Sequence, residues 1–397
     1  VTCLINIYIM FQYKNLDNYL YFFIYIFPIS LLVGVFFLNL NSALISLFFL
    51  VYVFKNNKIE VINNQKYYFF YLVLILFFLT SIFSKYKFQS FENLISFFSY
   101  ILMFVCLVFF LNTNKKNSIK LSKIVFIIVL IICVDLWIQR ILGTNILGFP
   151  QQQAGRLTSF FKDEQIPGGI LFKLSPFYIY FLFKQKNNFF YKFKFLFILF
   201  LYFSILITGE RLASILSTFA LLLIPLVNYK KIKSTNLLIY FTVFIFVFIL
   251  LYLQSDSIIK ERITYTFLQF ENNIYFHMFN NAYEIFKDNF LLGTGLQTYR
   301  YECPILFQNC STHPHNFFME LLSDTGIFSA MIFYFGLIYL FFSKIKNSKS
   351  FFEKSIIFTF TLLLFFPFLP SGSFFNSYGM NLTWFSLGFI YSLKDDL

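Results

Sequence analysis

The arginines and histidines of this 397-residue sequence are the residues best suited to chemistry on an anionic ligand that carries hydroxyl groups. Arg offers a rigid planar fork that binds phosphate oxygens in pairs, whereas Lys acts as a point charge. A neutral imidazole can accept a proton from a sugar hydroxyl near neutral pH. The arginines are Arg140, Arg156, Arg211, Arg262 and Arg300, and the histidines are His277, His313 and His315.

Arg211 has the strongest individual case among the arginines. It follows Thr208, Gly209 and Glu210 at a tight turn between two apolar segments. This position places its guanidinium at a helix N-terminus, where the helix dipole also favours an anion. The alternative is that the arginines cap helices or pair with nearby acids. An exposed pair with Glu210 would contribute only about 0 to 1 kcal/mol.

The segment HPHNFFMELLSDTG, residues 313–326, is the second candidate. Its apolar side chains recur every four residues on one face, and its polar side chains, among them Asn316 and Glu320, recur on another. This pattern predicts a short amphipathic helix that lies at an interface, begins with His315 in its first turn and ends at Gly326. His315 is therefore a candidate general base. The alternative is a histidine that only caps the helix.

The composition is that of a membrane protein. Hydrophobic residues make up 59% and charged residues 12% of the sequence, whereas soluble domains are about a quarter charged. A net charge of +13 would suggest a nucleic-acid partner for a soluble protein. Here Lys near helix ends is expected to fix the topology, so no nucleic-acid partner is predicted. The 66 Phe indicate codon bias rather than an aromatic binding surface.

The elements that must position these side chains are membrane-spanning helices, each of which needs about 20 mainly apolar residues. The sequence predicts an all-α, polytopic integral membrane protein with about twelve such helices and no cleavable signal peptide. Translation starts at Val1 or at Met10. The spans are expected near residues 19–36, 39–54, 67–83, 93–111, 123–142, 167–183, 193–208, 212–228, 236–253, 326–342, 355–370 and 374–393.

Lysines concentrate in alternate loops, which the positive-inside rule places in the cytoplasm together with both termini. The arginines and histidines then lie on or near the outer face of a bacterial inner membrane. The large outer loop reads as helical. The predicted organisation is a cytoplasmic N-terminus (1–18), nine spans (19–253) with an outer loop (143–166), a large periplasmic loop (254–325), three further spans (326–393) and a cytoplasmic tail (394–397).

Two pairs of residues are expected to interact. Cys303 and Cys310 bracket a short outer turn, and the compartment outside the inner membrane is oxidising, so we predict a disulfide between them. Asp135 and Lys173 lie at similar depth on consecutive spans, and ionisable groups inside a membrane usually pair or serve a pathway. We therefore predict an ion pair between Asp135 and Lys173.

No cofactor and no metal is predicted. The sequence contains no phosphate-binding GxxxxGK[ST] loop, no HExxH motif and no Cys/His cluster. Asp163 and Glu164 are adjacent acids in a loop, which are more often solvated than bound to a divalent cation.

Residues 120–345 resemble the O-antigen ligase and O-antigen polymerase family of membrane glycosyltransferases. The best match is His315 and Asn316, followed after nine residues by Gly326. Ser329 stands where the family has a second Gly.

Three further segments carry the resemblance. NAYEIFKDNFLLGTGLQTY, residues 281–299, is similar to the family's helix that ends in a Pro-Leu-Leu-Gly-x-Gly turn. It keeps Gly293 and Gly295 and has Phe290 where Pro is usual. TGERLAS, which contains Arg211, resembles a helix start of the family. GRLTSFFKDEQIPGG resembles its first outer loop.

One expected anion contact departs from the family pattern. The family often has an Arg shortly before the segment 281–299, and Tyr275 occupies roughly that place. His277 or Arg262 is expected to substitute for it.

The resemblance implies a metal-independent, inverting transfer of a glycan from undecaprenyl pyrophosphate to an acceptor hydroxyl on the outer side. A ligase uses a lipid A core sugar as the acceptor, and a polymerase uses another lipid-linked repeat. The implied roles are His315 as base, pyrophosphate binding by Arg211, Arg262 and Arg156, and support from Asn316, His313, Glu320, Gly326, Gly293 and Gly295. Arg300 is a further candidate for completing the site.

The ligase is the first reading and the polymerase the second. The sequence separates the two poorly, because variable outer loops choose the acceptor. A flippase of lipid-linked glycans is a third reading, from a different class. It would need charged residues along a path across the membrane, and only Asp135 and Lys173 are predicted to lie deep, both towards one side. The sequence leaves the sugar, the linkage and the oligomeric state open.

Overall fold

The computed structural model describes residues 15–151, 155–162, 164–184, 189–227, 241–242, 245–246, 249, 274–367 and 369–393. Within these ranges the chain is mainly helical, and an isolated β-bridge joins Thr144 and Pro150. Arg262, Asp163 and most of the predicted span 236–253 lie outside the described residues.

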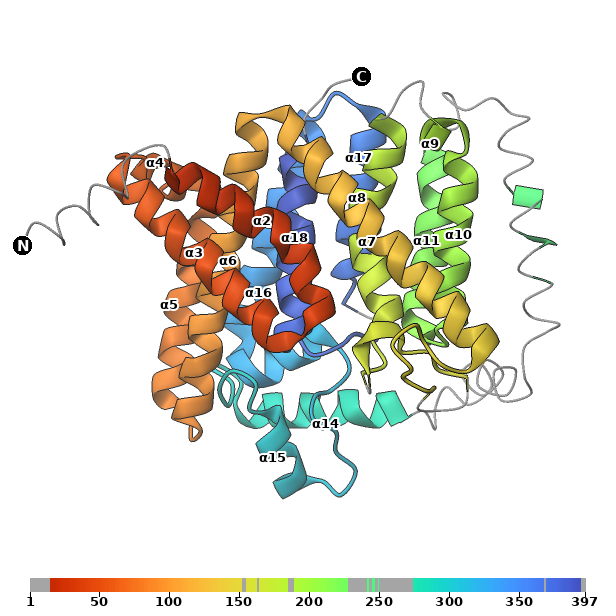
Figure 1. Ribbon diagram of the computed structural model, residues 1–397. Helices are drawn as coiled ribbons and strands as arrows, with labels where there is room; N and C mark the ends of the chain where they lie inside the picture. Colours follow the sequence, from red (N-terminus) through yellow and green to blue (C-terminus); the bar gives the residue numbers. More distant parts are fainter. Residues whose placement is uncertain are drawn as a thin grey trace, which may run out of the picture.

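Long apolar helices run side by side and form a bundle (Figure 1). Each predicted span other than 236–253 coincides with one of them. The bundle helices are α2 (Asn15–Val33), α3 (Val35–Lys55), α5 (Tyr68–Phe83), α6 (Lys87–Thr113), α7 (Lys115–Leu142), α8 (Pro167–Lys184), α10 (Lys194–Ile207), α11 (Arg211–Val227), α16 (Phe317–Asn347), α17 (Phe351–Leu364) and α18 (Ser377–Ser392).

The expected all-α membrane class is confirmed. Five helical stretches among the described residues are long and apolar enough to cross a membrane by length and composition. They are Val35–Lys55, Gln65–Phe83, Lys87–Thr113, Lys116–Leu142 and Phe317–Asn347.

Helix α18 is packed inside the bundle by aromatic contacts. Its Trp384 is fully buried, and the Trp384 ring centroid lies 5.5 Å from that of Phe70, 5.7 Å from Phe97 and 5.8 Å from Phe104. Aromatic pairs at such separations add stability beyond area burial. Helices in a membrane associate mainly through packing of this kind. The buried α18 gives a fixed base to the short segment that precedes it.

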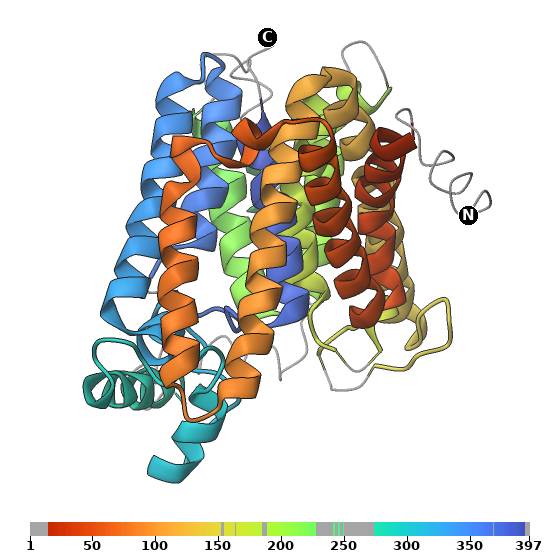
Figure 2. The same ribbon diagram turned by 90° about the vertical axis from the view of Figure 1, so that its left-hand side faces the viewer.

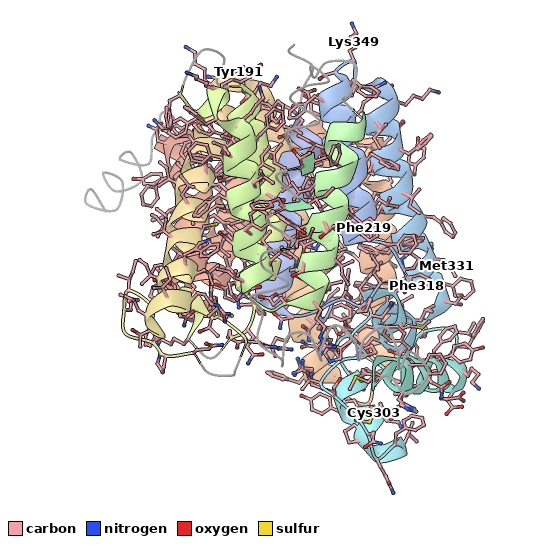
Figure 3. All side chains as sticks on the ribbon, turned by 90° about the vertical axis from the view of Figure 1, so that its right-hand side faces the viewer. Tyr191, Phe219, Cys303, Phe318, Met331 and Lys349 are labelled. Carbon is pink, nitrogen blue, oxygen red and sulfur yellow. A yellow bond between two sulfur atoms is a disulfide. The ribbon has the colours of Figure 1, made fainter. Side chains whose placement is uncertain are left out.

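The two ends of the bundle differ in their charged residues. Cys303 lies at the opposite end from Tyr191 and Lys349 (Figure 3). At the Cys303 end lie α14 (Ile274–Asp288), α15 (Tyr299–Leu306) and the loop between α7 and α8 (Figures 1 and 2). We term this the site end, since the described Arg residues and His313 and His315 come from segments located there. The Lys-rich loops around Tyr191 and Lys349 lie at the other end.

Candidate functional site

The backbone reverses direction at His315, immediately before helix α16. His315 adopts a left-handed conformation with a φ of 54°, which is uncommon for a residue with a side chain and is found at functional sites. The expectation that His315 lies in the first helical turn is wrong, because α16 begins at Phe317. Asn316 is the N-cap, and its Oδ1 accepts hydrogen bonds from the Phe318 N–H (3.0 Å) and the Met319 N–H (2.9 Å).

The segment before α18 holds this reversal in place. The Ser371 N–H donates to the His315 carbonyl (2.7 Å), and the Ser371 Oγ accepts from the Phe317 N–H (2.7 Å). Asn316 Nδ2 donates to the carbonyls of Pro367 (2.7 Å) and Leu369 (3.1 Å). The segment before α18 therefore fixes the His315 carbonyl, the Phe317 N–H and the Asn316 side chain.

Replacing Asn316 by Ala is expected to lower stability by about 1 to 2 kcal/mol, because the cap and two buried donor contacts are lost. Asn316→Ser keeps a capping hydroxyl but cannot reach the Pro367 and Leu369 carbonyls, so its stability should lie between that of the wild type and that of Asn316→Ala. Thermal unfolding of the purified protein in detergent measures the order. An Asn316→Ala protein that melts with the wild type would contradict this role.

The rings of the two histidines before α16 contact each other in a tilted arrangement, with centroids 4.0 Å apart and an interplanar angle of 50°. Burial, the neighbouring His315 and Arg300 lower the pKa of His313 to about 3. Burial also lowers the pKa of His315. Both rings are therefore neutral at pH 7. A neutral ring has a lone pair free to accept a proton.

Helix α16, which follows the histidines, carries two buried carboxylates, Glu320 and Asp324. Glu320 is 1% exposed, and its carboxylate accepts hydrogen bonds from the Ser373 hydroxyl (2.6 Å) and the Phe374 N–H. Asp324 is fully buried, and its Oδ1 accepts from the Tyr299 N–H (2.9 Å). The Arg300 guanidinium is close enough to interact electrostatically with both carboxylates and with His313. Arg300 thus belongs to the histidine and carboxylate group.

The three glycines expected to support the site meet at a kink in α16. Gly326 has a φ of 74° and a ψ of 177° inside the helix, a conformation open essentially only to Gly. The freed backbone groups pair with the turn after α14. The Ile327 N–H donates to the Phe290 carbonyl (2.9 Å), and the Gly295 N–H donates to the Asp324 carbonyl (2.9 Å). A Cβ on Gly293 would lie 2.4 Å from the backbone of Asp324.

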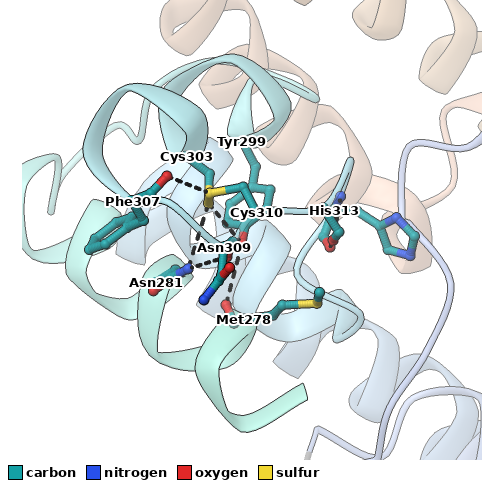
Figure 4. Close-up of a disulfide and its surroundings, with 9 residues drawn as sticks. Met278, Asn281, Tyr299, Cys303, Phe307, Asn309, Cys310 and His313 are labelled. Carbon is teal, nitrogen blue, oxygen red and sulfur yellow. Dashed lines mark hydrogen bonds between the residues drawn. A yellow bond between two sulfur atoms is a disulfide. The ribbon is translucent and has the colours of Figure 1, made fainter. Parts of the chain in front are cut away.

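The disulfide expected between Cys303 and Cys310 is present, with the two Cα atoms 5.9 Å apart. It joins Cys303 of α15 to Cys310 in the segment that precedes His313 (Figure 4). Asn281 of α14 donates to the Asn309 carbonyl (3.0 Å) inside this loop. The disulfide therefore ties the segment before His313 to α15, and the Asn281 hydrogen bond ties it to α14. Among the described residues, Cys106 and Cys133 are free and buried.

A second group of polar residues surrounds the turn between α10 and α11. The Glu210 carboxylate accepts hydrogen bonds from the Gly168 N–H (2.6 Å) and the Gly169 N–H (3.0 Å), the first backbone donors of α8. Burial raises the pKa of Glu210 to about 7, against the opposing effects of these bonds, Arg156 and Lys173. Arg211 begins α11, as its sequence context predicts.

Arg156 is held at the same turn. The Leu157 N–H donates to the Thr208 carbonyl (3.2 Å). Gly209, with a φ of +73°, lies so close that an added Cβ would be 2.0 Å from the Gly155 carbonyl oxygen. The Arg156 guanidinium donates to Gln165 Oε1, while its Nε is buried without a hydrogen-bond partner. We term Arg156, Lys173, Glu210 and Arg211 the cation junction.

The predicted ion pair between Asp135 and Lys173 is wrong. Asp135 accepts hydrogen bonds from the Ile146 N–H (2.8 Å) and the Ser159 hydroxyl (2.5 Å). Lys173 Nζ instead donates to the Gly379 carbonyl (3.0 Å) at the start of α18. The loop between α7 and α8 supplies the partners of the Asp135 carboxylate, so Asp135 and Lys173 contact different neighbours.

One short segment, residues 371–379, contacts both groups. Ser371 holds His315, Ser373 holds Glu320, and Gly379 accepts the hydrogen bond from Lys173. Both groups lie at the site end. Sequence reasoning missed this segment because it treated residues 371–373 as the gap between two spans and residues 374–379 as the start of the last span. The polar run Ser371-Gly372-Ser373 within apolar sequence is the signal that could have identified it.

His277 stands apart from both groups among the described residues. It is exposed on α14, where it was expected to substitute for a missing anion contact. Arg140 lies in the last turn of α7.

The fold and the site define a polytopic helical membrane protein whose polar groups converge at one end of the bundle. The family profile described as O-antigen ligase matches residues 195–334, a stretch that contains Arg211, His315 and the kink at Gly326. This match supports the expected O-antigen ligase and polymerase family over residues 195–334. No curated protein matches the chain.

Proposed function

We propose that this protein moves a glycan from undecaprenyl pyrophosphate to an acceptor hydroxyl at the site end, as an O-antigen ligase-like glycosyltransferase. The observation that carries this proposal is that one segment, residues 371–379, contacts both the neutral His315 and Lys173 of the cation junction. A base and an anion site in neighbouring positions suit the transfer of a sugar away from a diphosphate.

The proposed step is a single inverting displacement without a metal ion. His315 accepts the proton of the acceptor hydroxyl, and the oxygen attacks the anomeric carbon from the side opposite the diphosphate. The bond between that carbon and the diphosphate oxygen breaks, and the electron pair leaves with the lipid diphosphate. Arg211 and Arg156, together with Arg262, stabilise the charge that develops on the leaving group.

The charge distribution supports a membrane orientation. We propose that the protein lies in the bacterial inner membrane with the site end in the periplasm and both termini in the cytoplasm. Lysines gather at the opposite end of the bundle, as the positive-inside rule requires of a cytoplasmic face. The Cys303–Cys310 disulfide at the site end suits an oxidising compartment.

The acceptor distinguishes the two candidate enzymes. Purified protein in detergent is given an undecaprenyl-pyrophosphate-linked glycan together with lipid A core, and both lipid products are separated by size. A glycosylated core identifies a ligase. An unmodified core with a longer lipid-linked glycan identifies a polymerase that uses the same site. An intact donor and acceptor would contradict glycosyl transfer.

Replacing Arg211 by Ala is expected to lower the transfer rate about 100-fold, or about 3 kcal/mol in the barrier, because a charge-stabilising donor is lost. Arg211→Lys should recover part of the rate, since it keeps the charge but not the fork. Arg140→Ala, at the same end of the bundle, is the control and should act as wild type. Full activity in Arg211→Ala would remove Arg211 from the site.

A further inference from the structure

Lys173 is a cation near the outer end of the bundle that pairs with no carboxylate among the described residues. Its Nζ reaches the Gly379 carbonyl at 3.0 Å, and its side chain is only partly accessible. An ammonium has three N–H donors, and Gly379 is the one protein acceptor it reaches within the described chain. Desolvating a charge with so few partners costs free energy, so this position needs a counter-charge.

Glu210 is a carboxylate that can supply this counter-charge, but it supplies the charge only in part. It interacts electrostatically with Lys173 and Arg156. Both of its oxygens are already used by the Gly168 and Gly169 N–H groups. Burial also raises its pKa to about 7, so near neutral pH a substantial fraction of Glu210 carries no charge. One partly ionised carboxylate, Glu210, therefore faces two cations, Arg156 and Lys173.

The position of the ammonium suits a ligand bound between the two polar groups. Lys173 comes from α8 and Arg156 from the loop before it, and both interact electrostatically with Glu210, while Arg211 follows Glu210 directly in the chain at the start of α11. Gly379 also belongs to the segment that holds His315 and Glu320. An anion that contacts Lys173 would lie beside the segment that positions the histidine.

We propose that Lys173 is a further binding residue for the diphosphate of the lipid-linked donor, with its ammonium donating to a phosphate oxygen beside Arg156 and Arg211. This inference rests on the proposed function. It adds to that function a residue on a spanning helix, on the membrane side of the turn that carries Arg211. The lipid diphosphate supplies the negative charge that Glu210 provides only in part.

Binding of undecaprenyl pyrophosphate to purified full-length protein tests the proposal, with undecaprenyl monophosphate as the second probe. Lys173→Met keeps a long, unbranched side chain and removes the ammonium charge, and its unfolding temperature shows whether it folds. Its affinity for the pyrophosphate should fall about tenfold, the loss expected for one charge-assisted hydrogen bond. Its affinity for the monophosphate should fall less, and Lys173→Arg should bind the pyrophosphate more tightly than Lys173→Met.

Lys85→Met is the matched control, because Lys85 is an exposed lysine at the site end whose side chain is 80% exposed and pairs with Glu302 at 3.5 Å. It should bind both lipids as wild type does. A Lys173 that only ties α8 to α18 would leave the affinity of folded Lys173→Met unchanged and overturn the proposal. If Lys173→Met does not fold, the wild type and Lys173→Arg decide the matter. The proposal is overturned if neither protein binds undecaprenyl pyrophosphate more tightly than undecaprenyl monophosphate.

The binding readout separates this inference from the proposed reaction. If wild type transfers glycan while Lys173→Met binds undecaprenyl pyrophosphate normally, only the role of Lys173 fails. If wild type transfers no glycan but binds undecaprenyl pyrophosphate through Lys173, the diphosphate site stands and the transfer reaction fails.

Discussion

Replacing His315 by Asn is expected to reduce glycan transfer by roughly 10²- to 10⁴-fold, the range typical of a lost general base. Asn is the informative substitution because His315 has a φ of 54°, and Asn tolerates the left-handed region better than most residues. The backbone reversal and its hydrogen bond to Ser371 should therefore persist. The initial rate at saturating donor and acceptor measures the loss of the imidazole alone.

His277→Asn is the control for this substitution. His277 is exposed on α14, so its replacement should leave the rate unchanged. Unfolding temperatures of both variants should match that of the wild type. A His315→Asn protein that transfers glycan at the wild-type rate would assign the proton transfer to another group.

Replacing Gly326 by Ala is expected to destabilise the protein by about 3 kcal/mol, since a side chain at a φ of 74° and a ψ of 177° is strained. The added Cβ would also lie 2.2 Å from the Leu291 carbonyl oxygen, so the turn after α14 must move. The unfolding temperature of the detergent-solubilised protein should fall clearly, and transfer should fall with it.

Gly372→Ala provides the comparison. No atom lies within 4 Å of a Cβ placed on Gly372, so this substitution should leave the unfolding temperature within error of the wild type. If Gly326→Ala melts together with Gly372→Ala, the kink in α16 does not require glycine.

Sequence patterns predicted the local features of the site well. The four-residue repeats in 313–326 predicted the helical start of α16 and its interruption at Gly326, because periodicity and glycine placement are local properties of the backbone. The expected interfacial position was wrong, since the polar residues Glu320 and Asp324 are buried as well as the apolar ones. The position of Arg211 at a helix start followed from the turn residues before it. The proximity of Cys303 and Cys310 followed from their short separation.

The contacts between distant segments could not be predicted in this way. The hydrogen bond from the Ser371 N–H to the His315 carbonyl joins residues far apart in the chain, and no periodicity predicts such a contact. Equal depth on two helices led to the wrong pairing of Asp135 with Lys173. Depth alone does not fix helix rotation, and the outer loop supplied hydrogen bonds that satisfied Asp135 first. Helix α16 begins at Phe317, after His315 rather than around it, because the Asn316 side chain caps the helix.

The release of free undecaprenyl pyrophosphate by the wild-type protein tests the central claim most directly. Purified protein is incubated with the lipid-linked glycan and lipid A core, and both the released lipid diphosphate and the glycosylated acceptor are quantified. The account predicts one undecaprenyl pyrophosphate for each glycan joined to an acceptor, whether that acceptor is the core or another lipid-linked repeat. A donor that remains intact, or a glycan that appears on acceptor without release of the diphosphate, would contradict it.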